Sequence, residues 1–172
     1  MPGFAIRRAT AADASVLAHQ RAGMFRDMGE LPDELHDPLV KASTAYFARA
    51  IPEGSYVAWL AQNRDAPAPP APGEIVGGAG LQLRELLPRP HPERTRLMRG
   101  PQALILNVFT ERSWRRRGVA EALMRELLVW CRDNGVESVV LHASNEGRPL
   151  YEKLGFTATN EMRLGGKGAV KR

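Results

Sequence analysis

The stretch Asn107-Val-Phe-Thr-Glu-Arg-Ser-Trp-Arg-Arg-Arg-Gly-Val-Ala120 joins an apolar run to an amphipathic one through an arginine-rich turn. The run before it, 103–109, is almost wholly apolar, which is typical of a central strand buried on both faces. From Gly118 to Asn134 apolar residues recur four apart, and Asn134-Gly135 is a stop signal, so we expect a helix there. The sequence predicts strand, turn and helix in direct succession.

This turn has the chemistry of an anion site. The first amides of a helix lack intrahelical partners, and the helix dipole adds partial positive charge there. Gly118 lets an anion approach the backbone closely, small Val119 and Ala120 keep the helix start open, and Arg115 to Arg117 add donors for phosphate oxygens. The pattern is neither a Walker A loop nor a dinucleotide fingerprint. On the turn alone, a solvated arginine run that caps a helix is an equally good interpretation.

On either side of this strand, turn and helix, the sequence predicts further strands and helices. Strands are expected over 4–8, 55–62, 74–84, 138–142 and 157–164, and helices over 10–28, 39–50 and 148–154. The intervening segments 29–38, 65–73 and 86–102 are predicted loops, the second of them the proline-rich tip of a hairpin. The fold class is therefore α/β (α+β by some schemes): one mixed, mostly antiparallel sheet of about six strands with helices on both faces.

Composition narrows the class of protein. The 172 residues suit a single domain, 1–164, with a basic tail at 165–172. One cysteine, Cys131, and four unclustered histidines give no disulfide framework and no expected metal site. The N-terminus has no signal-peptide pattern and no apolar run reaches a span's roughly 18 residues, so we expect a cytoplasmic protein without a membrane partner. The net charge of +5 comes without a long basic run, which speaks against a nucleic-acid partner.

A second segment, His142-Ala-Ser-Asn-Glu-Gly-Arg-Pro-Leu-Tyr-Glu-Lys-Leu-Gly-Phe156, decides between the interpretations of the turn. Arg115-x-x-Gly118-x-Ala120 resembles the signature of the Gcn5-related N-acetyltransferase (GNAT) superfamily. Asn145 followed by Leu150 to Phe156 looks like that family's second cofactor motif. Both pieces occur in order, separated by a helix and a strand, and the close match covers roughly residues 104 to 164.

The resemblance implies direct transfer of an acetyl group from acetyl-coenzyme A to an amine, with no metal and no acyl-enzyme intermediate. It implies a bulge at the end of the fourth strand that binds the pantetheine arm. It also implies pyrophosphate on the turn amides, an asparagine on the pantetheine and a tyrosine as general acid. The residues that match these roles are Val108, Phe109 and Thr110 for the bulge, Arg116, Arg117, Gly118, Val119 and Ala120 for the amides, Arg115 for the polar lead position, Asn145 and Tyr151.

Elementary chemistry agrees with these roles. A tyrosine, with an ordinary pKa of about 10, can protonate a departing thiolate whose conjugate acid has a pKa of about 8.5. The developing negative charge on the carbonyl oxygen needs a donor, for which a backbone amide near Thr110 is suitable. The attacking amine must be neutral, and Glu111, just past the bulge, is a weak candidate for its base.

The acceptor side is less determined. Asn107 lies in the apolar strand, where a polar side chain is costly unless paired, and is a candidate hydrogen-bonding group for substrate. Glu30, Asp33 and Glu34 lie between the first two helices and form either an acidic rim for a cationic amine or a solvated loop. We expect Cys131 in the core, Trp114 packed at the turn, and His142 as only a weak base candidate.

The acceptor, a small molecule or a peptide amine, is left open by these motifs, as is the choice between monomer and homodimer. Many members of the family end with two strands after the second motif, whereas this chain has clear room for one. Two other functions fit parts of the sequence: a non-catalytic coenzyme A sensor, which an intact Tyr151 argues against, and a basic nucleic-acid binder.

Overall fold

A computed structural model describes residues 3–65 and 74–162 of the chain. These fall into two compact units, Met1–His142 and Ala143–Arg172, which we describe separately. The expected loop tip at 66–73 and the expected basic tail at 165–172 lie outside the described residues.

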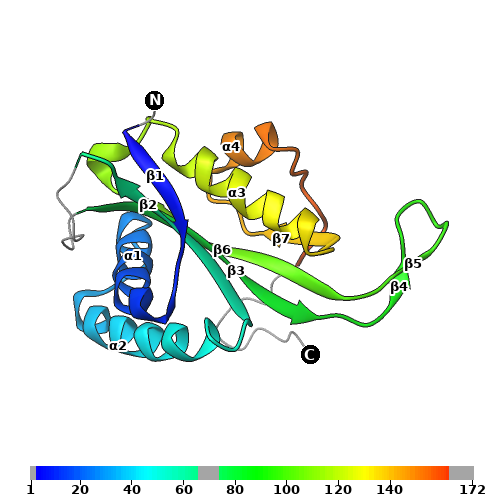
Figure 1. Cartoon of the computed structure of the whole chain (residues 1–172), viewed down its shortest axis with the longest axis horizontal. Coiled ribbons are helices and arrows are strands. Elements are labelled where there is room, and N and C mark those ends of the chain that lie inside the picture. The colour runs from blue at the N-terminus through cyan, green and yellow to red at the C-terminus, as the bar shows by residue number, and fades with distance from the viewer. Residues whose placement is uncertain (1–2, 66–73, 163–172) are drawn as a thin grey trace, which may run out of the picture. The chain divides into compact units, whose positions relative to one another are not determined.

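A mixed sheet forms the centre of the first unit, as predicted for this fold class, but it has five strands where about six were expected (Figure 1). Its strands are β1 (Phe4–Arg8), β2 (Tyr56–Asn63), β3 (Ile75–Glu85), β6 (Pro101–Thr110) and β7 (Ser138–Leu141). They lie in the order β1-β2-β3-β6-β7, and only β6 and β7 run parallel. The apolar run thus forms an interior strand, and β2 and β3 form the predicted hairpin.

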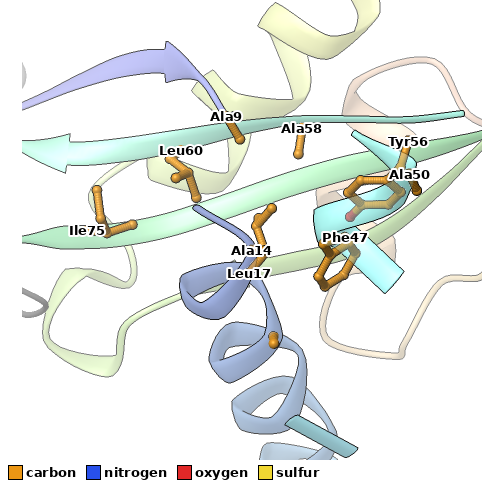
Figure 2. Close-up of a cluster of buried hydrophobic side chains, with 10 residues drawn as sticks. Ala9, Ala14, Leu17, Phe47, Ala50, Tyr56, Ala58, Leu60 and Ile75 are labelled. Atoms are coloured by element: carbon orange, nitrogen blue, oxygen red, sulfur yellow. The ribbon is translucent and has the colours of Figure 1, made fainter. Parts of the chain in front are cut away.

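Helices cover both faces of this sheet, as expected. Figure 1 shows α1 (Ala14–Asp27) and α2 (Asp33–Ala50) on one face and α3 (Val119–Asp133) on the other. Figure 2 shows the core that α1 and α2 form with β2 and β3, in which aromatic, aliphatic and small side chains interlock; it contains Ala9, Ala14, Leu17, Ala18, Phe47, Ala50, Tyr56, Ala58, Leu60 and Ile75. Burial of this apolar surface is the main force that holds the helices on the sheet.

Local signals set the start of α1 and the end of α3. The backbone amide of Thr10 donates to the Asp13 carboxylate at 2.8 Å as part of a capping box, and a 3₁₀ turn precedes α1. Gly135, with φ of 66°, follows the last turn of α3. The predicted stripe of α3 is buried; its most enclosed members are Val119, Leu123, Met124, Leu127 and Cys131.

The predicted start of the second helix at Leu39 is wrong, because α2 begins at Asp33. Asp33 and Glu34 therefore lie in the first turn of a helix, where their charge complements the helix dipole. Pro38 stands inside α2, near enough to its start that the lost hydrogen bond falls among the early turns. Packing of Phe47 and Ala50 in the core outweighs that loss.

The segment 86–102, predicted as a loop, carries strand pairing. β4 (Arg89–Pro90) and β5 (Leu97–Met98) form a two-stranded ribbon that continues the β3–β6 hairpin beyond the sheet, as Figure 1 shows. Pro90 fits because each strand of such a ribbon has an open edge, where a missing N–H costs no ladder bond.

The last predicted strand, 157–164, is wrong for its described part. Residues 157–162 carry no strand, and the remaining two lie outside the described residues. Alternating threonines favour an extended chain, but a strand exists only where a neighbouring strand accepts its hydrogen bonds. The second unit contains the predicted short helix as α4 (Arg148–Lys153).

Candidate active site

The turn before α3 presents backbone amides without partners. Arg116 and Gly118 have φ of 62° and 80°, so the chain turns sharply before the helix begins. The first helical bond runs from the Ala122 amide to the Gly118 carbonyl at 3.0 Å. No described residue accepts a hydrogen bond from the amides of Gly118, Val119 or Ala120, and no side chain caps the helix. This arrangement matches an anion site at a helix N-terminus.

The three arginines of the turn have different surroundings. The Arg115 guanidinium donates through Nε to the Thr110 carbonyl at 3.1 Å and pairs with the Asp27 carboxylate. The Arg117 guanidinium lies over the Trp114 ring, 5.0 Å from its centre, while Arg116 is exposed. Trp114 packs at the turn as predicted. Arg115 therefore ties the turn to the end of β6.

Asp27, the last residue of α1, contacts this turn, and the sequence did not reveal that contact. Its carboxylate accepts from Arg112 Nη2 at 2.7 Å and also from Arg115. The hydrogen bond from Arg112, supported by the one from Arg115, lowers the pKa of Asp27. The end of α1 is thus fixed to the candidate phosphate turn by two arginines.

A β-bulge interrupts β6 beside this turn. Gly78 faces Phe109 while Gly80 faces Leu106, so β6 has one more residue than β3 over this interval. Asn107 adopts a φ of 57°, a left-handed conformation that asparagine tolerates better than most residues. The family resemblance placed the bulge at Val108, Phe109 and Thr110, and the observed irregularity begins at Asn107.

Beyond this bulge, β6 has an open edge. Its parallel pairing with β7 ends at Ile105 opposite Leu141, and no described strand pairs with 106–110 on that side. The Thr110 hydroxyl is buried without a hydrogen-bond partner in the described structure. Unpaired strand backbone of this kind accepts an extended ligand as an additional strand. The structure therefore brings the predicted residues Val108, Phe109 and Thr110 together with the turn.

Asn107 is paired, which accounts for a polar side chain in an apolar strand. Its Oδ1 accepts from Arg21 at 2.6 Å and its Nδ2 donates to the Tyr56 hydroxyl at 2.9 Å. The side chain is buried, and burial also raises the pKa of Tyr56. A Cβ at Gly80 would lie 2.1 Å from the Tyr56 hydroxyl oxygen, so glycine leaves the space that this network occupies.

Arg21 on α1 is the second residue that sequence reasoning missed. Its guanidinium lies 4.8 Å from the centre of the Phe25 ring, and burial lowers its pKa. No described carboxylate forms an ion pair with it. One signal was available: Arg21 lies four residues after Leu17, on the side of α1 that faces the core. Its partner Asn107 lies 86 residues away, which no local pattern reveals.

The predicted acidic residues are all exposed. Glu30 is exposed in the connection between α1 and α2, whereas Asp33 and Glu34 are exposed on the first turn of α2. Glu111 is exposed at the start of a 3₁₀ turn, and its amide donates to the Val76 carbonyl at 2.9 Å. Cys131 is buried as predicted, and burial raises its thiol pKa to about 11.

The second unit holds the remaining predicted residues. Asn145 is exposed in the connection that precedes α4. Tyr151 lies on α4, edge-on to Phe156 with ring centres 6.2 Å apart, and no described residue hydrogen-bonds its hydroxyl. Burial raises the pKa of Tyr151, so the phenol stays protonated at neutral pH.

The described residues offer no candidate metal site. Within 3–65 and 74–162, no group of three or more His, Cys, Asp or Glu side chains is arranged to hold a metal ion. None of the helices in the described part of the chain is long and apolar enough to cross a membrane.

The fold and the turn are those of an acyltransferase, and comparison with known proteins specifies the family. The model of the acetyltransferase (GNAT) family matches residues 25–156. The chain therefore belongs to the GNAT family of acetyltransferases.

Individual similar proteins are also acetyltransferases. A glucosamine 6-phosphate N-acetyltransferase of Trypanosoma brucei brucei is 37% identical over 95 residues, 54% of this chain and 58% of that enzyme. The alignment thus spans little more than half of either protein. An aminoglycoside N(6')-acetyltransferase type 1 of Stenotrophomonas maltophilia is 28% identical over 81% of each chain. A solved GCN5-related N-acetyltransferase of Ralstonia eutropha JMP134 is 26% identical, with a TM-score of 0.76 over 95% of this chain and 98% of that one.

Proposed function

We propose that this protein transfers an acetyl group from acetyl-coenzyme A directly to the primary amine of a small molecule. One observation carries the proposal: the open edge of β6 at the bulge leads straight into a turn whose amides have no partners among the described residues. An extended amide-containing arm that ends in a pyrophosphate is complementary to that sequence of backbone groups. Membership of the GNAT family supports the same donor.

In this proposal the backbone of Val108, Phe109 and Thr110 holds the pantetheine arm. The amides from Arg116 to Ala120 hold the pyrophosphate, with Arg115 as the polar lead residue. Asn145 hydrogen-bonds the pantetheine. A backbone amide near Thr110 donates to the carbonyl oxygen as negative charge develops there.

The chemical step needs no covalent enzyme intermediate. The neutral amine nitrogen attacks the thioester carbon, the C–N bond forms, and the C–S bond breaks. The departing thiolate takes the phenolic proton of Tyr151, whose raised pKa keeps that proton available at neutral pH. The amine loses a proton to Glu111 or to water, and the products are an amide and coenzyme A.

Two relatives support a small-molecule acceptor. Enzymes named for glucosamine 6-phosphate and for aminoglycosides both act on amines of sugars. We therefore propose a small-molecule amine and assign no peptide substrate.

Thiol release from acetyl-coenzyme A tests this function. The acceptor panel contains glucosamine, glucosamine 6-phosphate, an aminoglycoside, an α-amino acid and the amide of that amino acid. At least one acceptor should raise release well above hydrolysis, and Tyr151→Phe should lower kcat by roughly 10²- to 10⁴-fold. Coenzyme A affinity of the variant, measured by calorimetry, should stay within about threefold of wild type, since the phenol acts in the chemical step.

Two results would contradict the proposal. Coenzyme A binding without release for any acceptor would indicate a sensor, and an unchanged kcat in Tyr151→Phe would remove the assigned acid.

A further inference from the structure

Arg21 is a cation whose charge the described protein leaves uncompensated. Two other arginines of the first unit have carboxylate partners, since Arg7 pairs with Asp13 at 2.7 Å and Arg96 pairs with Glu137 at 2.8 Å. Arg8 has no carboxylate partner among the described residues either, but its guanidinium lies over the Trp59 and Trp130 rings. Among the described residues, Arg21 donates a hydrogen bond only to the neutral Asn107 amide oxygen, and its guanidinium also lies over the Phe25 ring. A guanidinium has five N–H donors, so most of its hydrogen-bonding capacity is unused.

The partner of Arg21 is held rigidly. Asn107 lies at the bulge with φ of 57°, is 5% exposed, and its Nδ2 is fixed by the Tyr56 hydroxyl at 2.9 Å. Tyr56 is itself 1% exposed. The amide can therefore present only Oδ1 to Arg21, and this contact orients the guanidinium without neutralising it. Desolvation of an unpaired cation costs free energy that a bound anion would restore.

The position of Arg21 relates it to the reaction. Its partner Asn107 immediately precedes Val108 to Thr110, the strand edge we assign to the thioester arm. A Cβ at Gly23, two residues further along α1, would lie 3.1 Å from the Phe109 ring. This part of α1 thus lines the bulge from the face of the sheet that α1 and α2 cover. The edge of β6 assigned to the cofactor is the one opposite β3.

We infer that Arg21 binds an anionic group of the acceptor, so that the substrate is an amine that also carries a phosphate or a carboxylate. This inference rests on the proposed function and narrows its acceptor class. A guanidinium forms two parallel hydrogen bonds with either anion, whereas a polycationic amine would be repelled at the same place.

Paired acceptors test the inference in the wild-type protein. Glucosamine 6-phosphate is compared with glucosamine, and the α-amino acid with its amide, so that the two arms separate phosphate from carboxylate. One anionic member should have at least a tenfold higher kcat/KM than its neutral partner, about the effect of one charged hydrogen bond. Equal kcat/KM within both pairs, or a preference for the aminoglycoside, would overturn the inference.

Variants of Arg21 locate the effect. Arg21→Met should raise KM for the anionic acceptor by about 10- to 100-fold, with kcat and the neutral acceptor little changed. Arg21→Lys should recover part of the loss because it keeps the charge. Arg26→Met on the same helix is the matched control, since Arg26 is exposed. If Arg21→Met lowers kcat equally for all acceptors, Arg21 acts on the reacting carbonyl or on Asn107 and the inference is wrong.

A binding measurement separates this inference from the proposed function. With coenzyme A saturating, inorganic phosphate should raise the melting temperature of wild type and Arg26→Met but not of Arg21→Met. If no acceptor releases thiol while this protection persists, the function fails and the anion site stands. If thiol is released but phosphate protects all three proteins equally, the function stands and the anion site fails.

Discussion

The two sides of the candidate site are built from different parts of the chain. In the first unit, the side we assign to the cofactor consists of backbone amides and one strand edge within 106–120, and Asn145 of the second unit is assigned to the same side. The acceptor side consists of side chains brought together by the fold, with Arg21 and Asn107 separated by 86 residues. A site made of contiguous backbone depends on local conformation and on few side chains. A site made of distant side chains depends on the whole core.

The largest expected effect is on the cofactor side, at Gly118. With φ of 80° and nothing within 4 Å of the place a Cβ would take, this residue has room for a side chain but a left-handed backbone. Gly118→Asp places a carboxylate beside the amides assigned to pyrophosphate, and charge repulsion should weaken coenzyme A binding by roughly 100-fold or more. Isothermal titration calorimetry measures this loss.

Gly118→Asn is the matched control, because it has nearly the same shape, no charge, and a similar tolerance of positive φ. We expect it to weaken coenzyme A binding by less than about tenfold. If both variants bind coenzyme A as wild type does, the pyrophosphate binds elsewhere and the turn does not belong to the cofactor side.

The next effect concerns the acceptor side, at Asn107. Asn107→Gly removes both hydrogen bonds of the buried amide and should lower the free energy of unfolding by about 2–3 kcal/mol. Asn107→Val should cost about 1–2 kcal/mol more, because a branched side chain is strained at positive φ. Urea unfolding measures both. Equal stabilities for the two variants would mean that the bulge relaxes and that φ at this position carries no constraint.

The sequence predicted the features that depend on local patterns and missed those that depend on distant contacts. The apolar run of β6, the stripe of α3 and the stop at Gly135 are local patterns, and all three were confirmed. The strand predicted at 157–164 failed in its described part because pairing depends on a neighbour that propensity does not reveal. The predicted start of α2 at Leu39 was too late, because Pro38 is a local helix-breaking signal. In the structure tertiary packing outweighs that signal, and the helix begins at Asp33.

The candidate site divides likewise. The turn at Arg115 to Ala120 and the bulge region followed from contiguous motifs, whereas Arg21 and Asp27 did not. Each of the latter acts through a partner more than eighty residues away, Asn107 and the arginines of the turn respectively. A single helical sequence shows at most that Arg21 faces the core, and nothing in it identifies the residue that Arg21 meets.

A smaller effect is expected at Glu111, which directly follows β6. Its side chain is exposed, so water can replace it as proton acceptor. Glu111→Gln should lower kcat by less than about tenfold near neutral pH and leave KM for the acceptor unchanged. Steady-state rates with the best acceptor of the panel measure this. A loss of 100-fold or more, with a shifted pH profile, would make Glu111 the principal base.

The smallest effect is expected at Asp27, which joins the two sides through Arg112 and Arg115. These ion pairs lie near the surface, so Asp27→Asn should cost no more than about 1 kcal/mol of unfolding free energy. The bond from Arg112 lowers the pKa of Asp27 below the unfolded value of about 3.9. Its stabilisation is therefore present above about pH 4 and is lost as the pH falls through the folded pKa. Urea unfolding from pH 7 to pH 3 should show wild type approaching the variant at the acid end.

Coenzyme A binding of the same variant shows whether α1 and the turn are coupled. Asp27 neutralises charge beside the turn that we assign to pyrophosphate, so Asp27→Asn should tighten coenzyme A binding about two- to fivefold at low salt. This gain should vanish as salt screens the charges of the turn. Asp133→Asn is the matched control, because Asp133 ends α3 as Asp27 ends α1 and lies at the opposite end of that helix from the turn. Weaker binding by Asp27→Asn would mean that this carboxylate positions Arg115 for the cofactor, and the separation of the two sides would then be incomplete.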